Sequence, residues 1–376
     1  MGNAGDKLNI VMLGHKRIPS REGGIEIVVE ELATRMAADG HNVTCLNRAG
    51  KHVSGKEYDV AAQKEYKGVR IKTVPTLDKK GLAAMTASVT GAIAAAFGKY
   101  DVVHFHAEGP CAMLWLPKLL GKRCIATVHG LDHQRAKWGR FARTYIMLGE
   151  KCAVKFADEI IVLSRGVRQY FKDTYDRETV FIPNGVTMPE VREADQITEA
   201  FGLAKNSYIL FLGRLVPEKG IHYLIEAFRK IETDKKLVIA GGVSDSGTYG
   251  DELKELAAGD DRILFTGFVQ GRMLEELYSN AYIYVLPSDL EGMPLSLLEA
   301  LSYGNCCVVS DIPECTEVVE DKAYIFPRGN AEALTKCLQA LCVDSDAVNT
   351  MKSLSTLVCR KYDWDDVTKK TLELYR

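Results

Sequence analysis

The sequence predicts an α/β protein made of two doubly wound domains, each with a parallel sheet and helices on both of its faces. Short β-rich runs alternate with helical patterns along the chain, and this alternation stops at a polar stretch and then begins again. The length of 376 residues and the hydrophobic content of 47% are sufficient for two ordinary globular cores. We expect the first domain at residues 1–186, the second at residues 187–362, and a closing helix at residues 363–376 whose parent domain the pattern does not fix.

Two series of β-rich runs define the expected strands. In the first domain the runs lie at residues 8–13, 41–46, 69–74, 101–106, 123–130, 159–164 and 179–185. Between the first two runs, apolar residues recur at helical spacing and predict a helix that covers the sheet with one face: Ile25, Val28, Val29, Leu32 and Met36. In the second domain the runs lie at residues 208–213, 236–242, 262–268, 281–288, 305–311 and 323–326. Ligands of such sheets bind beyond the carboxyl ends of the strands, so we expect the site there, facing a cleft between the domains.

The cysteines and the longest uncharged stretch indicate where the protein resides. Ten cysteines lie scattered between Cys45 and Cys359 without a CxxC pair, and no leader shows the basic, apolar and small-residue order of a signal peptide. These features predict reduced thiols and a cytoplasmic protein. Residues 81–98 contain no charge but are rich in alanine, glycine and hydroxyl side chains, which predicts a close-packed helix of a soluble domain rather than a membrane span.

The stretch 287–304, PSDLEGMPLSLLEALSYG, predicts a helix start that binds an anion. Pro294 fits the first helical position, because its missing N–H group is not needed there. The backbone amides of Met293, Leu295 and Ser296 then lack partners within the helix, and such a terminus attracts phosphate. The alternative is a surface loop followed by a helix that merely begins with proline.

Two carboxylates, Glu291 and Glu299, flank this helix start. Glu291 would repel a phosphate unless its carboxylate faces hydroxyl groups, so the pair indicates a ligand that carries both phosphates and a polyol. Arg214 and Lys219 follow an earlier strand at the same expected sheet edge, and two such cations can neutralise a diphosphate. Taken alone, the two cations would more commonly be solvated.

Two features of the first domain also lie at strand ends. Gly23 and Gly24 directly precede the first predicted helix, where the backbone can approach a ligand without interference from a Cβ atom. A long turn with a glycine hinge is the alternative. His129 stands at the end of a strand, before Gly130, where it would face the cleft.

No motif predicts a bound cofactor or metal. No GxGxxG follows a strand, and no GxxxxGK[ST] occurs. Four histidines near the ends of two strands match no strong metal-ligand spacing: His104, His106, His129 and His133. The Asp-x-Asp pairs Asp344/Asp346 and Asp363/Asp365 are typical of helix caps or solvated acids. We expect no cofactor, no metal and no nucleic acid as partners.

With these motifs the chain resembles the retaining glycosyltransferases of family 4 over nearly its whole length. The residues that carry the resemblance are GRLVPEKG at 213–220, the Glu-x7-Glu stretch at 287–304 and IPNGV at 182–186. GGIEIVVEELA and HGLDHQRAKWGRFA are similar to a bacterial branch that builds capsule or exopolysaccharide, including rhamnosyl- and hexosyltransferases. The resemblance implies the GT-B fold, in which two Rossmann-like domains face each other across a cleft and the closing helix returns to the first domain.

The resemblance also implies roles for residues of the second domain. It assigns Arg214 and Lys219 to the diphosphate of a sugar donor. It assigns Glu299 to the ribose hydroxyls and Glu291 to the hydroxyls of the donor sugar. The last loop of this domain, SDIPECTEVVE, keeps Glu317 but lacks the glycine pair that the family usually has there.

In the first domain, the resemblance places His129 beside the transferred sugar, and Gly24, with Gly23, near the phosphates. The mechanism implied is a front-face attack, in which the leaving β-phosphate takes the acceptor proton while cations and helix amides stabilise its charge. Such a mechanism requires no metal. The residues expected to act in catalysis are His129, Arg214, Lys219 and Glu291.

The function implied is transfer of a sugar from a UDP, GDP or dTDP sugar to a growing, lipid-linked surface polysaccharide. Two alternatives stay open. One is a sugar-nucleotide epimerase on the same fold, and the other is a non-catalytic sugar-binding protein. A pure binding role would not call for both the cation pair and the glutamate pair.

The distribution of charge favours an acceptor at the membrane. Residues 1–186 hold 28 Lys and Arg against 19 Asp and Glu, a net charge of +9, whereas residues 187–376 hold 20 against 31, a net charge of −11. Within 133–143, cations alternate with aromatic side chains: Arg135, Lys137, Trp138, Arg140, Phe141 and Arg143. Anionic lipids attract such cations by about 1 kcal/mol each, which favours a peripheral protein on the inner face of the cell membrane. The alternative is a solvated basic helix.

Overall fold

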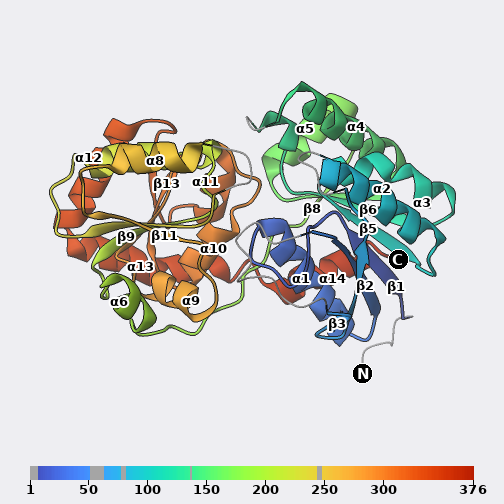
Figure 1. Ribbon diagram of the computed structural model, residues 1–376, viewed down its shortest axis with the longest axis horizontal. Coiled ribbons are helices and arrows are strands. Elements are labelled where there is room, and N and C mark those ends of the chain that lie inside the picture. Colours follow the sequence, from blue (N-terminus) through green and yellow to red (C-terminus); the bar gives the residue numbers. More distant parts are fainter. Residues whose placement is uncertain (1–6, 51–62, 78–81, 136–137, 244–247) are drawn as a thin grey trace. The chain divides into compact units, whose positions relative to one another are not determined.

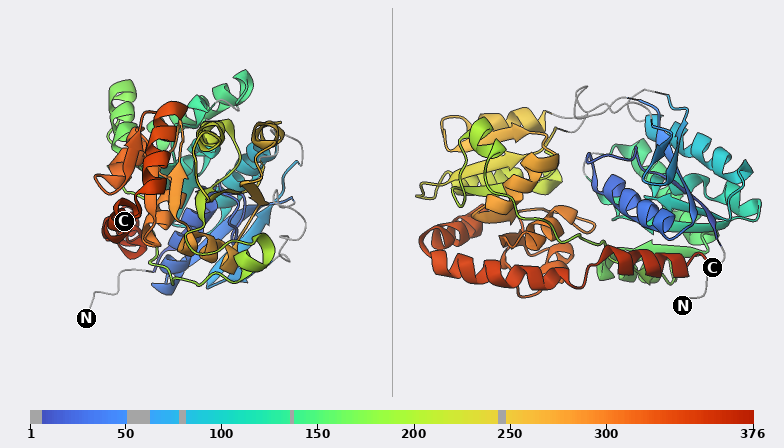
Figure 2. Two further views of the ribbon diagram at one scale, coloured as in Figure 1. Left: turned by 90° about the vertical axis from the view of Figure 1, so that its left-hand side faces the viewer. Right: turned by 90° about the horizontal axis from the view of Figure 1, so that it is seen from below.

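The computed structural model describes residues 7–50, 63–77, 82–135, 138–243 and 248–376. The chain divides into two compact units (Figure 1, Figure 2): unit 1 holds residues 1–184 and 364–376, and unit 2 holds residues 185–363. The first boundary lies two residues before the expected 186, and the second lies one residue after the expected 362. Each unit is built on a parallel sheet with helices, which confirms the predicted fold class.

Unit 1 contains an eight-stranded sheet with the strand order β3-β4-β2-β1-β5-β6-β7-β8. The strands are β1 (Asn9–Leu13), β2 (Asn42–Arg48), β3 (Glu65–Tyr66), β4 (Val69–Val74), β5 (Val102–His106), β6 (Arg123–Val128), β7 (Glu159–Val162) and β8 (Val180–Phe181). Neighbouring strands are parallel except for β3 and β4, which pair antiparallel. Strand β3 was not predicted from the sequence, because a strand of two residues is too short to show alternation.

One hydrophobic cluster joins the sheet of unit 1 to several of its helices. The helices are α1 (Gly24–Ala38), α2 (Leu82–Phe97), α3 (Trp115–Leu119), α4 (Arg140–Phe156) and α5 (Arg165–Tyr175), with the 3-10 helices η2 (Gly109–Met113) and η3 (Asp132–Gln134). Side chains of α2, η2, α4 and α5 share the cluster with β1, β5, β6 and β7. The uncharged stretch at 81–98 largely forms α2, which buries alanines against the sheet. Within the described residues, no helix is long and apolar enough to cross a membrane.

The end of the chain completes unit 1. The last helix, α14 (Trp364–Glu373), packs against α1, where Arg35 Nε donates to Asp365 Oδ1 at 2.7 Å. Arg123 Nε donates to the carbonyl oxygen of Leu374 at 2.8 Å. The buried Tyr375 hydroxyl lies 2.6 Å from His104 Nδ1. The closing segment is therefore part of the first core.

Unit 2 contains a six-stranded, all-parallel sheet with the order β11-β10-β9-β12-β13-β14. The strands are β9 (Tyr208–Leu212), β10 (Lys236–Ala240), β11 (Ile263–Gly267), β12 (Ile283–Leu286), β13 (Cys306–Ser310) and β14 (Tyr324–Phe326). The helices are α6 (Gln196–Phe201), η4 (Pro217–Lys219), α7 (Ile221–Phe228), α8 (Tyr249–Ala257), α9 (Gly271–Asn280), α10 (Leu295–Ser302), α11 (Pro313–Val319), α12 (Ala331–Val343) and α13 (Ser345–Cys359). All six expected runs of the second domain form strands.

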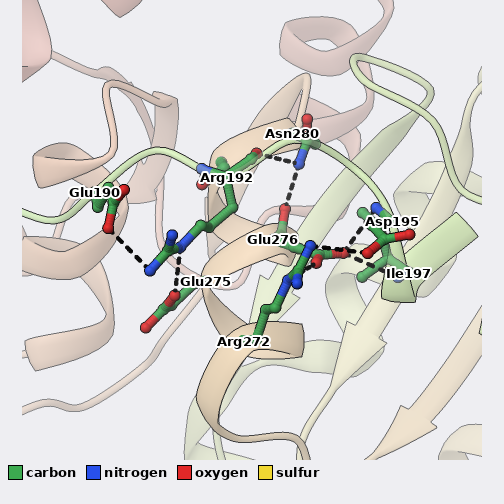
Figure 3. A network of polar contacts seen from close by, with 9 residues as sticks. Glu190, Arg192, Asp195, Ile197, Arg272, Glu275, Glu276 and Asn280 are labelled. Carbon is green, nitrogen blue, oxygen red and sulfur yellow. Dashed lines mark hydrogen bonds and ion pairs between the residues drawn. The ribbon is translucent and has the colours of Figure 1, made fainter.

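A buried glutamate on α9 holds the polar stretch that opens unit 2 (Figure 3). The Glu276 carboxylate is fully buried and accepts hydrogen bonds from the amides of Asp195 and Ile197, at 2.9 and 3.2 Å, and from Arg272 Nε at 2.9 Å. The side chain of the N-cap residue, Asp195, does not cap the start of α6. Glu276 therefore supplies the acceptor for these amides. Burial alone would raise the pKa of Glu276, but the hydrogen bonds from the two amides and from Arg272 together hold that pKa below its ordinary value.

We expect Glu276→Ala to lower the free energy of unfolding of unit 2 by about 2–4 kcal/mol, because it leaves two amides and a guanidinium without their buried acceptor. The matched control is Glu275→Ala, which removes the neighbouring carboxylate of an exposed ion pair with Arg192 and should cost less than about 1 kcal/mol. Hydrogen exchange of the α6 and α9 amides measures both effects. Equal losses in the two variants would contradict the role of Glu276.

Candidate functional site

Two loops of unit 2 meet beyond the carboxyl ends of neighbouring strands. One follows β9 at residues 213–220, and the other follows β12 at residues 287–294. Gly220 has a φ of +64°, and a Cβ atom there would lie 2.0 Å from the carbonyl oxygen of Pro287. The Asp289 amide donates to the carbonyl oxygen of Glu218 at 2.9 Å. Only glycine allows this close approach, which brings the two loops together.

The meeting loops place Lys219 against Glu291. Lys219 Nζ donates to Glu291 Oε1 at 2.6 Å, and the Ser288 hydroxyl donates to the same oxygen at 2.6 Å. The Lys219 and Glu291 side chains are only 14% and 9% exposed. From the sequence, Lys219 and Glu291 were predicted to bind different parts of a ligand, whereas in the structure they form an ion pair with each other.

Arg214 lies in the same loop as Lys219 and is half-buried. Across the residues that the structure describes, no side chain forms a hydrogen bond or an ion pair with its guanidinium group. Because Lys219 and Glu291 neutralise each other, Arg214 is the cation of this loop with a charge to offer to an anion.

The helix that follows Glu291 begins one residue later than predicted. Pro294 is the N-cap of α10 rather than its first residue, since its φ and ψ of −75° and 103° are extended, and the Leu297 amide donates to its carbonyl oxygen at 3.1 Å. No side chain caps this end. Met293 and Leu295 are buried beside it. The helix start therefore has the uncapped backbone that the sequence analysis expected near an anion.

Glu299 lies further along α10 and is half-buried. The Tyr278 hydroxyl donates to Glu299 Oε2 at 3.0 Å, and the ring of Tyr303 stacks on Tyr278 with 5.3 Å between the ring centroids. Burial raises the pKa of Tyr278, so its hydroxyl stays a donor at neutral pH. Glu317, in α11, is also half-buried.

Three of the four histidines singled out in unit 1 lie together at the ends of β5 and β6. His106 Nδ1 lies 3.1 Å from His129 Nε2, and the rings of His104 and His106 have centroids 4.1 Å apart. His104 Nε2 lies 2.7 Å from the Thr127 hydroxyl. Burial lowers the pKa of His129 to about 4 and that of His104 to about 3, so both rings are neutral at pH 7.

The glycine pair stands at the start of α1, as expected, but a glutamate accompanies it. Gly23 is the N-cap, and a Cβ atom there would lie 2.5 Å from Glu26 Oε2. The buried Glu26 carboxylate accepts a hydrogen bond from the Lys16 amide at 2.8 Å. The Glu26 carboxylate therefore already lies at this helix start, where phosphates were predicted near Gly24. Glu26 lies in the first turn of α1, where acidic residues are favoured. This position in the sequence could have identified Glu26 as a residue of the helix start.

The basic segment at 133–143 is not one exposed helix. Arg135 Nε pairs with Asp132 Oδ1 at 2.7 Å and its side chain is only 16% exposed, so it contributes little to the surface. Trp138 is half-buried, and Lys137 lies outside the described residues. The exposed part is the start of α4, with Arg140, Arg143 and Phe141, whose side chain is 71% exposed.

Comparison with known proteins matches each unit to a family. Residues 22–188 match the model described as Glycosyltransferase Family 4, and residues 194–355 match the model described as Glycosyl transferases group 1. An uncharacterized glycosyltransferase of Methanocaldococcus jannaschii is 26% identical over 98% of this chain and 98% of its own. A phosphatidyl-myo-inositol mannosyltransferase of Mycobacterium leprae is 26% identical over 94% of this chain and 92% of its own.

Solved structures share the fold of this chain. HepE of Anabaena in complex with UDP and glucose has a TM-score of 0.80 at 16% identity, covering 97% of this chain and 98% of that one. Sucrose-phosphate synthase of Thermosynechococcus elongatus has a TM-score of 0.79 at 21% identity, covering 99% and 98%. Fold and sequence together define a glycosyltransferase with the GT-B fold. Unit 1 thus matches the Family 4 model and unit 2 the group 1 model, which supports a glycosyltransferase of the group 1 type with a Family 4 N-terminal domain.

The buried histidines make unit 1 sensitive to acid. Burial lowers the pKa of His15 and His129 to about 4 and that of His104 to about 3, from an ordinary 6.5. At a pH between the lowered and the ordinary pKa values, these histidines are protonated in the unfolded chain and neutral in the folded unit. The stability is therefore complete above pH 6.5 and falls as the pH falls, by up to about 1.4 kcal/mol per pH unit for each histidine.

Tryptophan fluorescence during urea unfolding measures this effect, because all three tryptophans lie in unit 1: Trp115, Trp138 and Trp364. We expect the urea midpoint to fall steadily from about pH 6.5 to about pH 5. The variant His104→Gln should show a smaller pH dependence. A midpoint that is constant over this range would contradict the neutral state of the histidines.

Proposed function

We propose that the protein is a retaining hexosyltransferase that transfers a sugar from a nucleoside diphosphate sugar to a growing surface polysaccharide. The observation that carries this proposal is the half-buried Arg214, which has no partner among the described residues and shares its loop with the Lys219–Glu291 ion pair. Such a guanidinium matches the fork geometry of a diphosphate. Anabaena HepE, with a similar fold, was solved with UDP and glucose, which supports a donor of this class.

In the proposed reaction, Arg214 and the amides at the start of α10 bind the diphosphate and stabilise the charge that grows on the leaving phosphate. Glu299 accepts hydrogen bonds from the ribose hydroxyls, and Glu291 from hydroxyls of the donor sugar. The neutral His129 can provide one N–H group to a hydroxyl of the transferred sugar. The acceptor attacks from the face of the leaving phosphate, which takes the acceptor proton.

We expect Arg214→Ala to lower kcat by about a hundredfold or more, because preorganised positive charge is lost at the leaving group. Folding should be unchanged, since the substitution leaves no partner unpaired in the described residues. Lys219→Ala should also lower kcat, but with a lower Tm, because it leaves the buried Glu291 without its cation. Single-turnover assays measure the effect, with the donor chosen by thermal stabilisation against UDP, GDP, dTDP and their sugars.

The control for charge alone is Lys230→Ala, which removes an exposed cation of unit 2 and should leave kcat unchanged.

Glu299→Ala should mainly weaken nucleotide binding, because Glu299 is proposed to bind the ribose, far from the reacting carbon. Wild-type turnover of Arg214→Ala, or normal nucleotide affinity of Glu299→Ala, would refute these assignments. Nucleotide release that requires an acceptor distinguishes transfer from the epimerase alternative.

Transfer should proceed without a divalent ion, because Arg214 and the helix amides supply the positive potential that a metal would otherwise provide. We expect turnover in an excess of chelator to stay within about twofold of the untreated rate. The assay is run at a temperature at which circular dichroism shows an intact fold. Complete loss of turnover that added metal restores, with no change in the fold, would show that the reaction needs a metal.

We also propose that unit 1 docks on the anionic inner face of the cell membrane and receives a lipid-linked acceptor. The described charged residues on the exposed side of α4 are all cations: Arg140, Arg143, Lys151 and Lys155. The one carboxylate of this helix, Glu150, is buried, while Phe141 and Leu148 are 71% and 51% exposed. Exposed cations beside exposed apolar side chains are typical of a membrane surface. The relative from Mycobacterium leprae is named for a lipid acceptor, which supports this proposal.

Sedimentation with vesicles tests the docking. We expect binding to vesicles that contain phosphatidylglycerol, weaker binding to phosphatidylcholine alone, and a loss of about tenfold in affinity for Arg140→Glu/Arg143→Glu. The matched control, Lys230→Glu/Lys254→Glu, reverses two exposed cations of unit 2 and should bind as the wild type does. Binding that is negligible for both vesicles, or equal in the two double variants, would leave α4 a solvated basic helix.

A further inference from the structure

Three side chains that have no part in the proposed transfer meet inside unit 1. Glu108 lies directly before η2, His133 lies in η3, and Glu150 lies in the middle of α4. One oxygen of each carboxylate and Nδ1 of the imidazole all lie within 4.8 Å of one another. Both glutamates are fully buried, and the His133 side chain is 15% exposed.

Separate donors fix the outer oxygen of each carboxylate. Glu108 Oε2 accepts a hydrogen bond from the Asp132 amide at 2.8 Å. Glu150 Oε1 accepts hydrogen bonds from the hydroxyls of Tyr170, at 2.9 Å, and of Tyr175. These contacts turn the inner oxygens, Glu108 Oε1 and Glu150 Oε2, toward His133 Nδ1. Hydrogen bonds of this kind orient the ligands of metal sites.

The inner atoms have no hydrogen-bond partner among the described residues: Glu108 Oε1, His133 Nδ1 and Glu150 Oε2. Polar atoms in a protein interior are nearly always paired, so three orphaned atoms that face one point need a common partner. His133 Nδ1 lies 3.3 Å from Glu150 Oε2 without the geometry of a hydrogen bond, and 3.9 Å from Glu108 Oε1, which is too far for one.

Two buried carboxylates also require positive charge. In the part of the chain that the structure describes, neither Glu108 nor Glu150 forms an ion pair with Lys or Arg. A cation at the centre would bind both inner carboxylate oxygens and the lone pair of His133 Nδ1. A proton shared by the two carboxylates would leave His133 Nδ1 without a partner.

We propose that Glu108, His133 and Glu150 bind one divalent transition-metal ion, of the type of Zn²⁺ or Mn²⁺. A set of one imidazole nitrogen and two carboxylate oxygens suits these ions. The three ligands come from three segments, so the ion joins η3, the turn after His129, to η2 and α4. The site goes beyond the proposed transfer and stabilises unit 1 rather than taking part in the reaction.

Binding of Zn²⁺ and Mn²⁺ to the full chain tests the proposal. We expect isothermal titration calorimetry of chelator-treated protein to show one equivalent bound, and either ion to raise the Tm that tryptophan fluorescence reports for unit 1. Mn²⁺ serves as the second probe because thiols bind it weakly. Glu150→Gln and His133→Ala should each lower the affinity by about a hundredfold or more.

The matched control is Glu65→Gln, which makes the same change at an exposed position of unit 1 and should bind as the wild type does. Glu150→Gln keeps an oxygen for the tyrosine hydroxyls and removes a buried charge, so its Tm without metal should not fall. His133→Ala, nearer the surface, provides a second test if Glu150→Gln does not fold. Absence of binding to the wild type, or equal binding by wild type and both variants, would overturn the metal site and favour a shared proton.

Discussion

Parallel pairing of the strands is the constraint on which both units depend. When neighbouring strands run in one direction, each connection must cross a face of the sheet, and all carboxyl ends lie along the same edge. Strands β9 and β12 are neighbours in unit 2, so loops some seventy residues apart in the chain, at 213–220 and 287–294, meet there. Strands β5 and β6 are neighbours in unit 1, which brings His106 to His129. The order of the strands thus decides which polar side chains can act together.

The ion pair between Lys219 and Glu291 sets the electrostatics of the candidate donor site. Both side chains are nearly buried, and such a pair is held by its mutual attraction and by added hydrogen bonds, here from Ser288. A phosphate that binds Lys219 competes with Glu291 for the ammonium group. Glu291 would then need a new donor, and a sugar hydroxyl is the donor that a sugar nucleotide brings with it. A ligand with only phosphate would leave that buried carboxylate with the Ser288 hydroxyl as its donor and without a cation, so the proposed sites for the phosphates and for the sugar depend on each other.

Periodicity and turn residues predicted the elements well, because hydrophobic alternation and the glycines at strand ends are local signals. All of the expected runs form strands, and α1 and α2 lie where apolar spacing or an uncharged stretch placed helices. Contacts between loops were not predictable, since no local signal shows that Gly220 touches Pro287 or that Lys219 meets Glu291. Pro294 is compatible with both the N-cap and the first helical position, so the start of α10 was misplaced by one residue.

Unit 1 is built from two separate parts of the chain, residues 1–184 and 364–376. The chain leaves unit 1 after residue 184 and returns at residue 364, and the two crossing segments pair through the Val186 amide and the Tyr362 carbonyl oxygen at 2.7 Å. Tyr375 then reaches the buried His104, whose other nitrogen already contacts a hydroxyl. A chain that stopped before α14 would leave this buried imidazole nitrogen without a partner, at the cost of an unsatisfied polar group. Residues 364–376 therefore complete the polar pairing of His104, although unit 2 separates them in the sequence from the rest of unit 1.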